Sequence, residues 1–486
     1  MPRAARSGRF CSMPDLHDQI PSREKVLIIG AGPAGLAAAA ALKALEVPFD
    51  LVDRAKHVGG IWNEEREDSP VWPAMEMISS REFTQYEDML QPVSFPEFLS
   101  PGHMAKYLRA YAARHQLTDH FRPRVAVRTA RPFEDGIWQV ELSTGEILIY
   151  RAVISAHGIS QRPHRPDWAA DVPKSVQVIH SSEWSGPDGL EGQRVLVVGS
   201  GQSAADISVD AARRALEVRW SMRTGHWVVP RRIGRVPGDV AASREPSVLG
   251  GLNAKIAKSV ISRTVGNPAA AGLPRPAAPL LEDSVIVSDD VLDRVREGRI
   301  TPAGEVTGVE ADGTLTHLGP ELHAGHIRYA PDLIVLATGY EVGADHLPED
   351  VVPRSADGDL DLFLGAFPRG RDDLAFLGQQ RVAGGVLPVL VEQADLAAYV
   401  LAAREGDSAA LRQFQRLRAG SETAVQTAAT PAGGGMLGRL GGALGANRVT
   451  ARAAPTATAT RGENLVPSTD RDTLLARLRS VRELFD

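Results

Sequence analysis

Two glycine-rich turns in the sequence have the residue types and spacing that bind the pyrophosphate of a dinucleotide. Each follows a run of Val, Ile and Leu, at residues 26–29 and 195–198. The first glycine of such a turn allows a tight bend, the second lets the backbone approach the phosphates, and a third small residue lets helix and strand pack. The pyrophosphate then lies at a helix N-terminus, which favours negative charge. One such turn also occurs without a ligand, whereas two predict a pair of dinucleotides that exchange electrons.

The first turn contains Gly30, Gly32 and Gly35, and Pro33 opens the helix that follows. Proline suits this position because the first helical N–H needs no partner. A second predicted strand ends at Asp53, about twenty residues beyond the glycines, where a carboxylate can accept hydrogen bonds from ribose hydroxyls. The first turn is therefore predicted to bind a dinucleotide whose ribose carries free hydroxyls.

The second turn contains Gly199, Gly201 and Ala204, and the strand expected after it runs into Arg223 without an acidic residue at the ribose position. A guanidinium binds a phosphate through two parallel hydrogen bonds. The second site is therefore predicted to prefer a 2′-phosphorylated cofactor, NADPH over NADH. Arg219 is a second candidate for this contact, and the alternative is that Arg223 is an ordinary solvated surface residue.

Composition excludes several classes of protein. The chain has 486 residues, of which 43% are hydrophobic and 23% charged, as in a soluble protein of two or three domains. Its net charge of −6 gives no basic surplus for a nucleic acid, and no apolar run is long enough for a membrane span. The only cysteine, Cys11, excludes structural disulfides, thiolate metal sites and the cysteine pair of a flavin disulfide reductase. We expect no metal site, and a reducing, cytoplasmic compartment fits this cysteine usage.

The order of apolar segments predicts an α/β fold with two Rossmann-like dinucleotide-binding domains. Later apolar strands are expected at residues 151–158, 333–340 and 374–378, and the first of them is suited to return to the first sheet, so the second domain is predicted to be inserted into a discontinuous first domain. Residues 419–462 consist almost wholly of Ala, Gly, Thr and small polar residues, which cannot bury enough surface to offset ordering entropy. The predicted units are a disordered extension (1–22), the first part of the first dinucleotide-binding domain (23–162), the second, NADPH-binding domain (163–328), the second part of the first domain (329–410), a low-complexity insertion (411–465) and a C-terminal helix (466–486).

The motifs resemble, in their order, those of the flavin-containing monooxygenases, within a class that also holds the Baeyer–Villiger monooxygenases. The resemblance covers most of the chain, from about residue 25 to 403. The matching segments are 30–36 for FAD, the Gly-Gly-x-Trp at 59–62, the half-fingerprint at 180–184, 199–207 for NADPH, 221–224 at its phosphate, 336–340, and Glu392-Gln393. Together they are more specific than any single motif.

This resemblance implies an enzyme with FAD that is reduced by NADPH and then captures O2 as a C4a-hydroperoxyflavin. One oxygen atom then passes to a small substrate with a nucleophilic nitrogen or sulfur. Two alternatives stay open, namely Baeyer–Villiger oxygenation of a ketone and a non-oxygenating NADPH oxidase or redox flavoprotein. The partners implied are the small-molecule substrate and O2, and a homodimer is an open alternative for the assembly.

The resemblance also implies the residues of the site. The FAD residues are Gly30, Gly32, Pro33, Ala34, Gly35, Asp53, Arg54, Gly60, Ile61, Trp62, Val125, Gly339 and Gln393. The NADPH residues are Gly199, Ser200, Gly201, Gln202, Ser203, Ala204, Arg223 and Thr224. The catalytic candidates are Ile78, Ser79, His180 and Trp184.

The chain departs from the family pattern at several of these positions. Ile78 aligns with an asparagine that handles oxygen in the family, and a shift of the alignment puts Ser79 or Ser80 there instead. Lys174 and Val176 replace the aromatic residue and the glycine of the fingerprint. An aliphatic side chain donates no hydrogen bond, so cofactor binding is better supported than oxygenation. His180 either orients the nicotinamide, couples the two domains or is purely structural, and Trp62 either packs on the flavin or fills the core.

Overall fold

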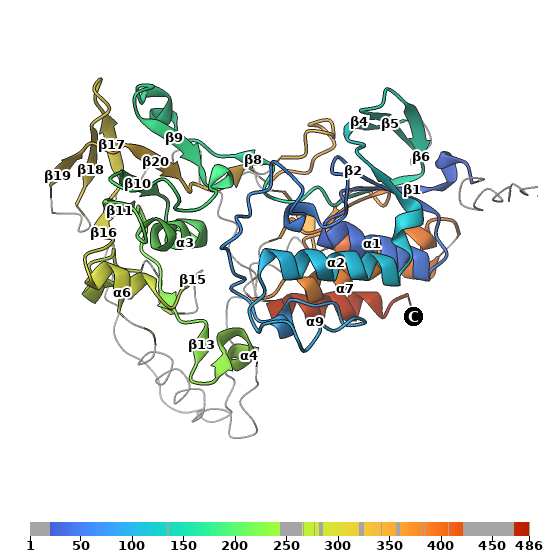
Figure 1. Cartoon of the computed structure of the whole chain (residues 1–486). Helices are drawn as coiled ribbons and strands as arrows, with labels where there is room; N and C mark the ends of the chain where they lie inside the picture. The colour runs from blue at the N-terminus through green and yellow to red at the C-terminus, as the bar shows by residue number, and fades with distance from the viewer. Residues whose placement is uncertain are drawn as a thin grey trace, which may run out of the picture.

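The structure, a computed structural model, consists of two lobes (Figure 1). It describes residues 20–133, 136–243, 265, 267–276, 278–280, 285–319, 325–341, 343–355, 360–380, 382, 384–406, 408–420 and 471–485. Each lobe holds a five-stranded sheet and a three-stranded antiparallel sheet. The predicted α/β fold with two dinucleotide-binding domains is confirmed.

The sheet of the first lobe has the strand order β24-β7-β1-β2-β3, and all neighbours are parallel. Its strands are β1 (Val26–Ile29), β2 (Phe49–Asp53), β3 (Phe121–Pro123), β7 (Ala152–Ser155) and β24 (Leu374–Phe376). Val26 and Ile28 face the helices, whereas Leu27 and Ile29 face the antiparallel sheet. Because both faces are covered, β1 reads as a continuous apolar run without polar alternation.

Helices cover one face of this sheet, and the antiparallel sheet covers the other. The helices are α1 (Pro33–Ala44), α2 (Pro101–Arg114), α7 (Leu387–Ala403), α8 (Ala409–Gly420) and α9 (Arg471–Arg482), and the antiparallel strands are β4 (Val127–Pro132), β5 (Trp138–Leu142) and β6 (Ile147–Tyr150). Alanines dominate α1, so its backbone approaches α7 closely. Within the predicted low-complexity insertion, residues 411–420 are helical instead, since Leu411 and Phe414 are buried in the core of the lobe. Residues 421–465 of that prediction lie outside the described residues, as do residues 1–19.

The predicted C-terminal helix is present as α9 and packs along α7 (Figure 1). Leu474 and Leu478 are buried against the core. Glu392 of α7, 2% exposed, accepts hydrogen bonds from Arg479 Nε at 2.6 Å and Arg482 Nη1 at 2.9 Å. Breaking a buried pair leaves an uncompensated charge, so this pairing fixes the register of α9 on α7.

The second lobe repeats the plan of the first. Its parallel sheet has the order β16-β11-β10-β20-β9. The strands are β9 (Gln177–His180), β10 (Arg194–Val198), β11 (Glu217–Ser221), β16 (Thr301–Ala303) and β20 (Leu333–Leu336), with α3 (Gln202–Ala211) and α6 (Val291–Arg296) on one face and β17 (Val306–Val309), β18 (Leu315–Leu318) and β19 (His326–Tyr329) on the other. Smaller elements are β12 (Val228–Val229), β13 (Arg232–Ile233), β14 (Val236–Pro237), α4 (Gly238–Ser243) and β15 (Ile286–Val287), and, in the first lobe, β22 (Leu362–Phe363) and β23 (Phe367–Pro368).

The predicted boundary at residues 328/329 is wrong, because β20 belongs to the second sheet. Leu333 to Leu336 pair with β10 on one side and β9 on the other. The chain crosses between the lobes at β8 (Arg162–Pro163) and β21 (Tyr340–Glu341), which pair antiparallel with each other. The second lobe is thus an insertion bounded by these two strands, about a dozen residues longer at its end than predicted.

A buried network of two histidines and a serine lies next to this crossing. Ser155 Oγ is 2.7 Å from His157 Nδ1 and 2.8 Å from His346 Nε2, and His157 Nε2 is 2.7 Å from the carbonyl oxygen of Gly343. A carbonyl only accepts, so His157 Nε2 carries a proton. Burial lowers the pKa of both histidines, so both rings are neutral, His157 Nδ1 accepts from Ser155 and His346 Nε2 donates to Ser155.

We expect this network to make the protein sensitive to acid. Burial lowers the pKa of His346 from 6.5 to about 3 and also lowers the pKa of His157. These folded-state values lie below the unfolded ones, so the stability is present above pH 6.5 and is lost as pH falls toward 3. Between pH 7.5 and pH 5, the free energy of unfolding of His346→Gln should fall by roughly 1–3 kcal/mol less than that of wild type. Urea unfolding at both pH values measures this difference. His326→Gln, at an exposed histidine, serves as the control, and equal acid sensitivity of wild type and His346→Gln would contradict the expectation.

None of the helices among the described residues is long and apolar enough to cross a membrane.

Candidate functional site

The first glycine turn is shaped by close packing of backbone on backbone. Gly30 has φ +103°, and a Cβ there would lie 2.4 Å from the carbonyl oxygen of Ala156. A Cβ on Gly35 would lie 1.8 Å from the carbonyl oxygen of Gly30. Gly32 is the N-cap of α1 without a side-chain cap, and Pro33 and Ala34 form its first residues. The helix therefore begins with N–H groups that are open to an anion, as a pyrophosphate site requires.

The Gly-Gly-x-Trp segment lies directly on this turn. Gly60, at φ +58°, would place a Cβ 2.9 Å from the Cα atom of Gly32. Ile61 and Trp62 continue the short 3₁₀ helix that starts at Gly60, and Trp62 packs against the core of the first lobe. Two glycines in contact leave a backbone-walled cradle beside the N-terminus of α1, which fits the pyrophosphate and ribityl chain of FAD.

Asp53 ties the end of β2 to the turn. Its Oδ2 accepts a hydrogen bond from the Ala31 N–H at 2.7 Å, and its Oδ1 accepts one from the Ala55 N–H at 2.8 Å. Asp53 is 9% exposed, and each of its carboxylate oxygens already accepts a backbone hydrogen bond. The contact with a ribose hydroxyl stays a prediction, and it would use the remaining lone pairs of these oxygens. Val125 donates its N–H to the Asp53 carbonyl, and the neighbouring Arg54 pairs with Asp68 at 2.7 Å on the surface.

Buried polar atoms at the end of β24 and in α7 also fit a bound flavin. Gln379 Nε2 and Gln393 Oε1 are buried and have no hydrogen-bond partner within the described residues. Gln393 Nε2 donates to the Leu364 carbonyl at 3.0 Å, which fixes its amide. A ligand edge with both donors and acceptors, such as that of an isoalloxazine ring, would satisfy such atoms. Gly339, also predicted to contact FAD, lies at the end of β20 near the crossing between the lobes.

The second turn resembles the first in its close backbone packing, but the space beside Gly201 is open. A Cβ on Gly199 would lie 2.2 Å from the Ala337 carbonyl oxygen, whereas a Cβ on Gly201 would meet nothing within 4 Å. Ala204 is fully buried, where helix α3 packs on β10. The Thr224 N–H donates to Ser200 Oγ at 3.4 Å, which joins the ends of β10 and β11. The open space at Gly201 is what the close approach of a pyrophosphate needs.

Gln202 and Ser203 begin α3. The Gln202 amide bonds both backbone groups of Val287 at 2.8 Å and donates to Asp206 Oδ1 at 2.9 Å. Burial raises the pKa of Asp206 to about 6. The side chain of Gln202 thus connects α3 to β15. The predicted contact between Gln202 and NADPH would therefore be made by the backbone of Gln202.

Only one of the two candidate arginines remains near the predicted phosphate position. Arg219 Nε pairs with Glu217 at 2.8 Å, and its guanidinium lies 4.1 Å from the centre of the Tyr329 ring, on the face covered by β19. Arg223 is exposed just after β11, at the carboxyl end of the sheet where the second turn lies. The geometry therefore favours Arg223.

His180 and Trp184 are both enclosed by protein. His180 is fully buried, with Nε2 3.0 Å from the Gly339 carbonyl and Nδ1 2.9 Å from Ser182 Oγ. Trp184 is 5% exposed and donates from Nε1 to Asp210 at 3.1 Å. Both ring nitrogens of His180 have protein partners, so of the three interpretations the structure favours a tether between β9 and the crossing. Trp184 packs in the core of the second lobe.

Ile78 and Ser79 lie on an interlobe segment, residues 72–98, that connects the two lobes. Trp72 packs into the core of the second lobe, and the Ser80 N–H donates to Asp239 of α4 at 2.6 Å. Ile78 is 39% exposed, and Ser79 Oγ is hydrogen-bonded to Thr84 Oγ1 at 2.9 Å. Ion pairs that join this segment to β13 and its flank are Glu76–Arg231 and Glu97–Arg232.

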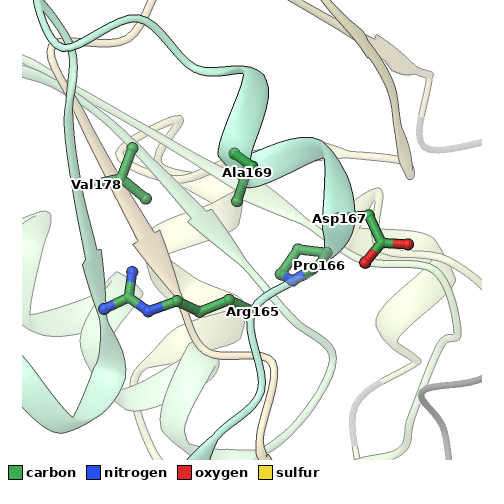
Figure 2. A pocket seen from close by; sticks show the side chains of 6 residues that line it. Arg165, Pro166, Asp167, Ala169 and Val178 are labelled. Carbon is green, nitrogen blue, oxygen red and sulfur yellow. The ribbon is translucent and has the colours of Figure 1, made fainter.

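A hollow of about 530 Å³ lies on the second lobe, beside β9. Figure 2 shows the side chains that line it. Its lining residues are Arg165, Pro166, Asp167, Ala169, Ala170 and Val178. None of the predicted cofactor or catalytic residues lines it, so we assign it no part in the site. The network of Ser155, His157 and His346 was not predicted, because the sequence of a strand end does not show which distant side chain it will meet.

Comparison with known proteins identifies the family. The family model for flavin-binding monooxygenase-like proteins matches residues 23–407. The chain is 28% identical over 392 residues to dimethylaniline monooxygenase [N-oxide-forming] 2 of Rattus norvegicus, which covers 76% of this chain and 72% of the relative. In fold it is similar to a flavin-containing monooxygenase from Stenotrophomonas maltophilia (TM-score 0.60, 18% identity, 79% of this chain and 99% of that one) and to the open structure of cyclohexanone monooxygenase (TM-score 0.57, 18% identity, 79% and 88%).

The chain belongs to the flavin-binding monooxygenase-like family. It is accordingly a flavin-dependent monooxygenase, and its cofactors are FAD and NADPH. The two backbone-walled turns and the unpaired buried amides fit these cofactors, with FAD in the first lobe and NADPH in the second.

Proposed function

We propose that this protein transfers one oxygen atom of O2 to a nucleophilic nitrogen or sulfur of a small substrate, with NADPH as the electron donor. The observation that carries the proposal is the pair of glycine turns at the carboxyl ends of two parallel sheets, with Arg223 beside the second. The sequence match to an N-oxide-forming relative favours nitrogen or sulfur over a ketone.

The bound flavin supplies the redox and oxygen chemistry, and the residues of the chain bind, orient and enclose the reactants. The N-termini of α1 and α3 hold the two pyrophosphates, so each ring system extends from a fixed point. The interlobe segment bridges the two lobes, and Trp72 and the Glu76–Arg231 pair set its position. Ile78 offers an aliphatic surface there, which excludes water without donating a hydrogen bond.

The experiment is a coupling measurement with purified, FAD-loaded protein. NADPH consumption, hydrogen peroxide and product are followed with a tertiary amine, a thioether and a cyclic ketone as separate substrates. We expect N-oxide or sulfoxide formation that accounts for most of the NADPH consumed. Ester formation from the ketone alone would favour the Baeyer–Villiger alternative, whereas peroxide equal to NADPH with every substrate would favour the oxidase.

A further inference from the structure

The partly exposed methionines among the described residues all lie on the interlobe segment. Met104 and Met222 are buried, at 0% and 2% exposure. Met75, Met77 and Met89 are partly exposed, and all three belong to the interlobe segment. In the part of the chain that the structure describes, the thioethers closest to solvent are therefore concentrated on one bridge between the lobes.

Met75 and Met77 attach this segment to different lobes. The side chain of Met75 packs against the core of the second lobe, and the side chain of Met77 packs against the core of the first. Glu76 lies between them, is exposed and pairs with Arg231 beside β13. The Met77 N–H donates to the Leu99 carbonyl at 2.9 Å, so the backbone is fixed here as well. Two thioethers at neighbouring positions thus provide apolar contacts to both cores.

The same segment also contacts the turn that fits FAD. Tyr86 is fully buried, and its hydroxyl donates to the Pro33 carbonyl at the start of α1 at 2.8 Å. The segment therefore links the first glycine turn, through the contacts of Met77 and Met75, to the core of the second lobe. Weaker packing of these two side chains would leave the second lobe less firmly positioned relative to the first turn.

A methionine thioether reacts with hydrogen peroxide to give a sulfoxide. A lone pair of the sulfur attacks one peroxide oxygen and the O–O bond breaks, so that one oxygen stays on the sulfur and the other leaves as water. The sulfur loses two electrons, which the peroxide gains. The product is polar, and a polar group packed against an apolar core costs free energy. Oxidation of Met75 or Met77 would therefore weaken the contacts that hold the segment.

The reaction of the enzyme itself supplies this oxidant when no substrate is oxygenated. NADPH, O2 and one proton are then converted into NADP⁺ and hydrogen peroxide, with two electrons passing from NADPH to O2. Exposed thioethers react before buried ones. This source of peroxide depends on the cofactors FAD and NADPH, and it is independent of the nitrogen or sulfur substrate proposed above.

We propose that Met75 and Met77 are sites of oxidation by hydrogen peroxide, and that their sulfoxides slow the reduction of FAD by NADPH. Hydride transfer needs a fixed geometry of the two ring systems, and a misplacement of about 1 Å costs up to roughly 100-fold in rate. A slower reduction of FAD releases less peroxide, so the two methionines limit the production of oxidant in the absence of substrate. Methionine sulfoxide reductase reverses the modification.

The test exposes the full-length, FAD-loaded protein to hydrogen peroxide and follows two quantities. Mass spectrometry of peptides gives the sulfoxide fraction at each methionine, and anaerobic mixing with NADPH gives the rate constant of flavin reduction. We expect Met75 and Met77 to be oxidised before the buried methionines, and the rate constant to fall roughly 10-fold as they are. Treatment with methionine sulfoxide reductase should restore the rate constant.

Variants without these thioethers separate this effect from general oxidative damage. The double variant Met75→Leu/Met77→Leu should have the wild-type rate constant and keep it after peroxide, because leucine has a similar volume and no sulfur. Met89→Leu is the matched control, since Met89 is also partly exposed on the same segment but follows the Tyr86 contact, against the core of the first lobe. This control should lose its rate as wild type does.

Complete conversion of Met75 and Met77 to sulfoxides with an unchanged rate constant would overturn the proposal. A double variant that loses its rate as fast as wild type would also overturn it, as would earlier oxidation of the buried methionines. The order of oxidation and its reversal are measured on wild type, so they decide the question even where a variant does not fold. The measurement needs no oxygenation substrate, so a failure of the proposed function leaves this result interpretable.

Discussion

Replacement of Gly35 by alanine should give a protein that no longer retains FAD. The added Cβ would lie 1.8 Å from the carbonyl oxygen of Gly30 and 2.9 Å from its carbonyl carbon. Both contacts are backbone atoms of the turn itself, so relief requires α1 to move away from β1. That movement displaces the helix N-terminus from the pyrophosphate, and we expect FAD affinity to fall at least about 100-fold, roughly 3 kcal/mol.

Gly201→Ala is the matched control, because the same change at the second turn meets no atom within 4 Å. This variant should fold, keep its yellow FAD and bind NADPH more weakly, since the methyl group occupies space that the pyrophosphate needs. Flavin absorbance after gel filtration and titration of the apoprotein with FAD measure the first effect. A stoichiometric flavin content in Gly35→Ala would show that the turn does not hold FAD.

Replacement of Arg223 by alanine should remove the preference for NADPH. A guanidinium–phosphate contact contributes about 1.5–3 kcal/mol, so the ratio of kcat/KM for NADPH to that for NADH should fall roughly 10- to 100-fold. The value of kcat/KM should decrease for NADPH alone, because NADH has no 2′-phosphate. Anaerobic reduction of the bound flavin, followed at its absorption maximum, gives both rate constants without any oxygenation substrate.

Arg219→Ala provides the comparison for this prediction. Arg219 has the same charge on the adjoining strand β11, but it pairs with Glu217 and stacks on Tyr329. Its removal should affect stability and leave the cofactor ratio unchanged. An Arg223→Ala protein with the wild-type ratio would exclude Arg223 as the phosphate-binding residue.

The strands of both sheets were predictable because they are buried on two faces. Continuous runs of Val, Ile and Leu such as β1 and β10 need no knowledge of their neighbours to be recognised. The prediction that residues 333–336 (β20) belong to the first domain was wrong, because an apolar run does not show which sheet it joins. Leu333 to Leu336 form an equally apolar strand, and nothing in the run itself says which of two similar sheets it joins. Sheet membership is a non-local property, fixed here by the β8–β21 pair.

The site was predictable where backbone geometry dictates residue type, and less so where hydrogen bonds decide a role. Glycines at turns are demanded by close packing, so their positions are visible in the sequence. The sequence shows a histidine at position 180, but not that Gly339 and Ser182 occupy both of its ring nitrogens.

The antiparallel pair β8–β21 has an implication for the modular construction of this enzyme. Pro163 and Tyr340 are cross-strand partners, so the two ends of the inserted lobe are only about 5 Å apart. Every strand of the FAD sheet comes from outside residues 163–340. A short hairpin turn can therefore join the two ends of the flavin half in place of the inserted residues, and a module grafted at the same two peptide bonds must also accommodate Trp72, which packs into the core of the second lobe.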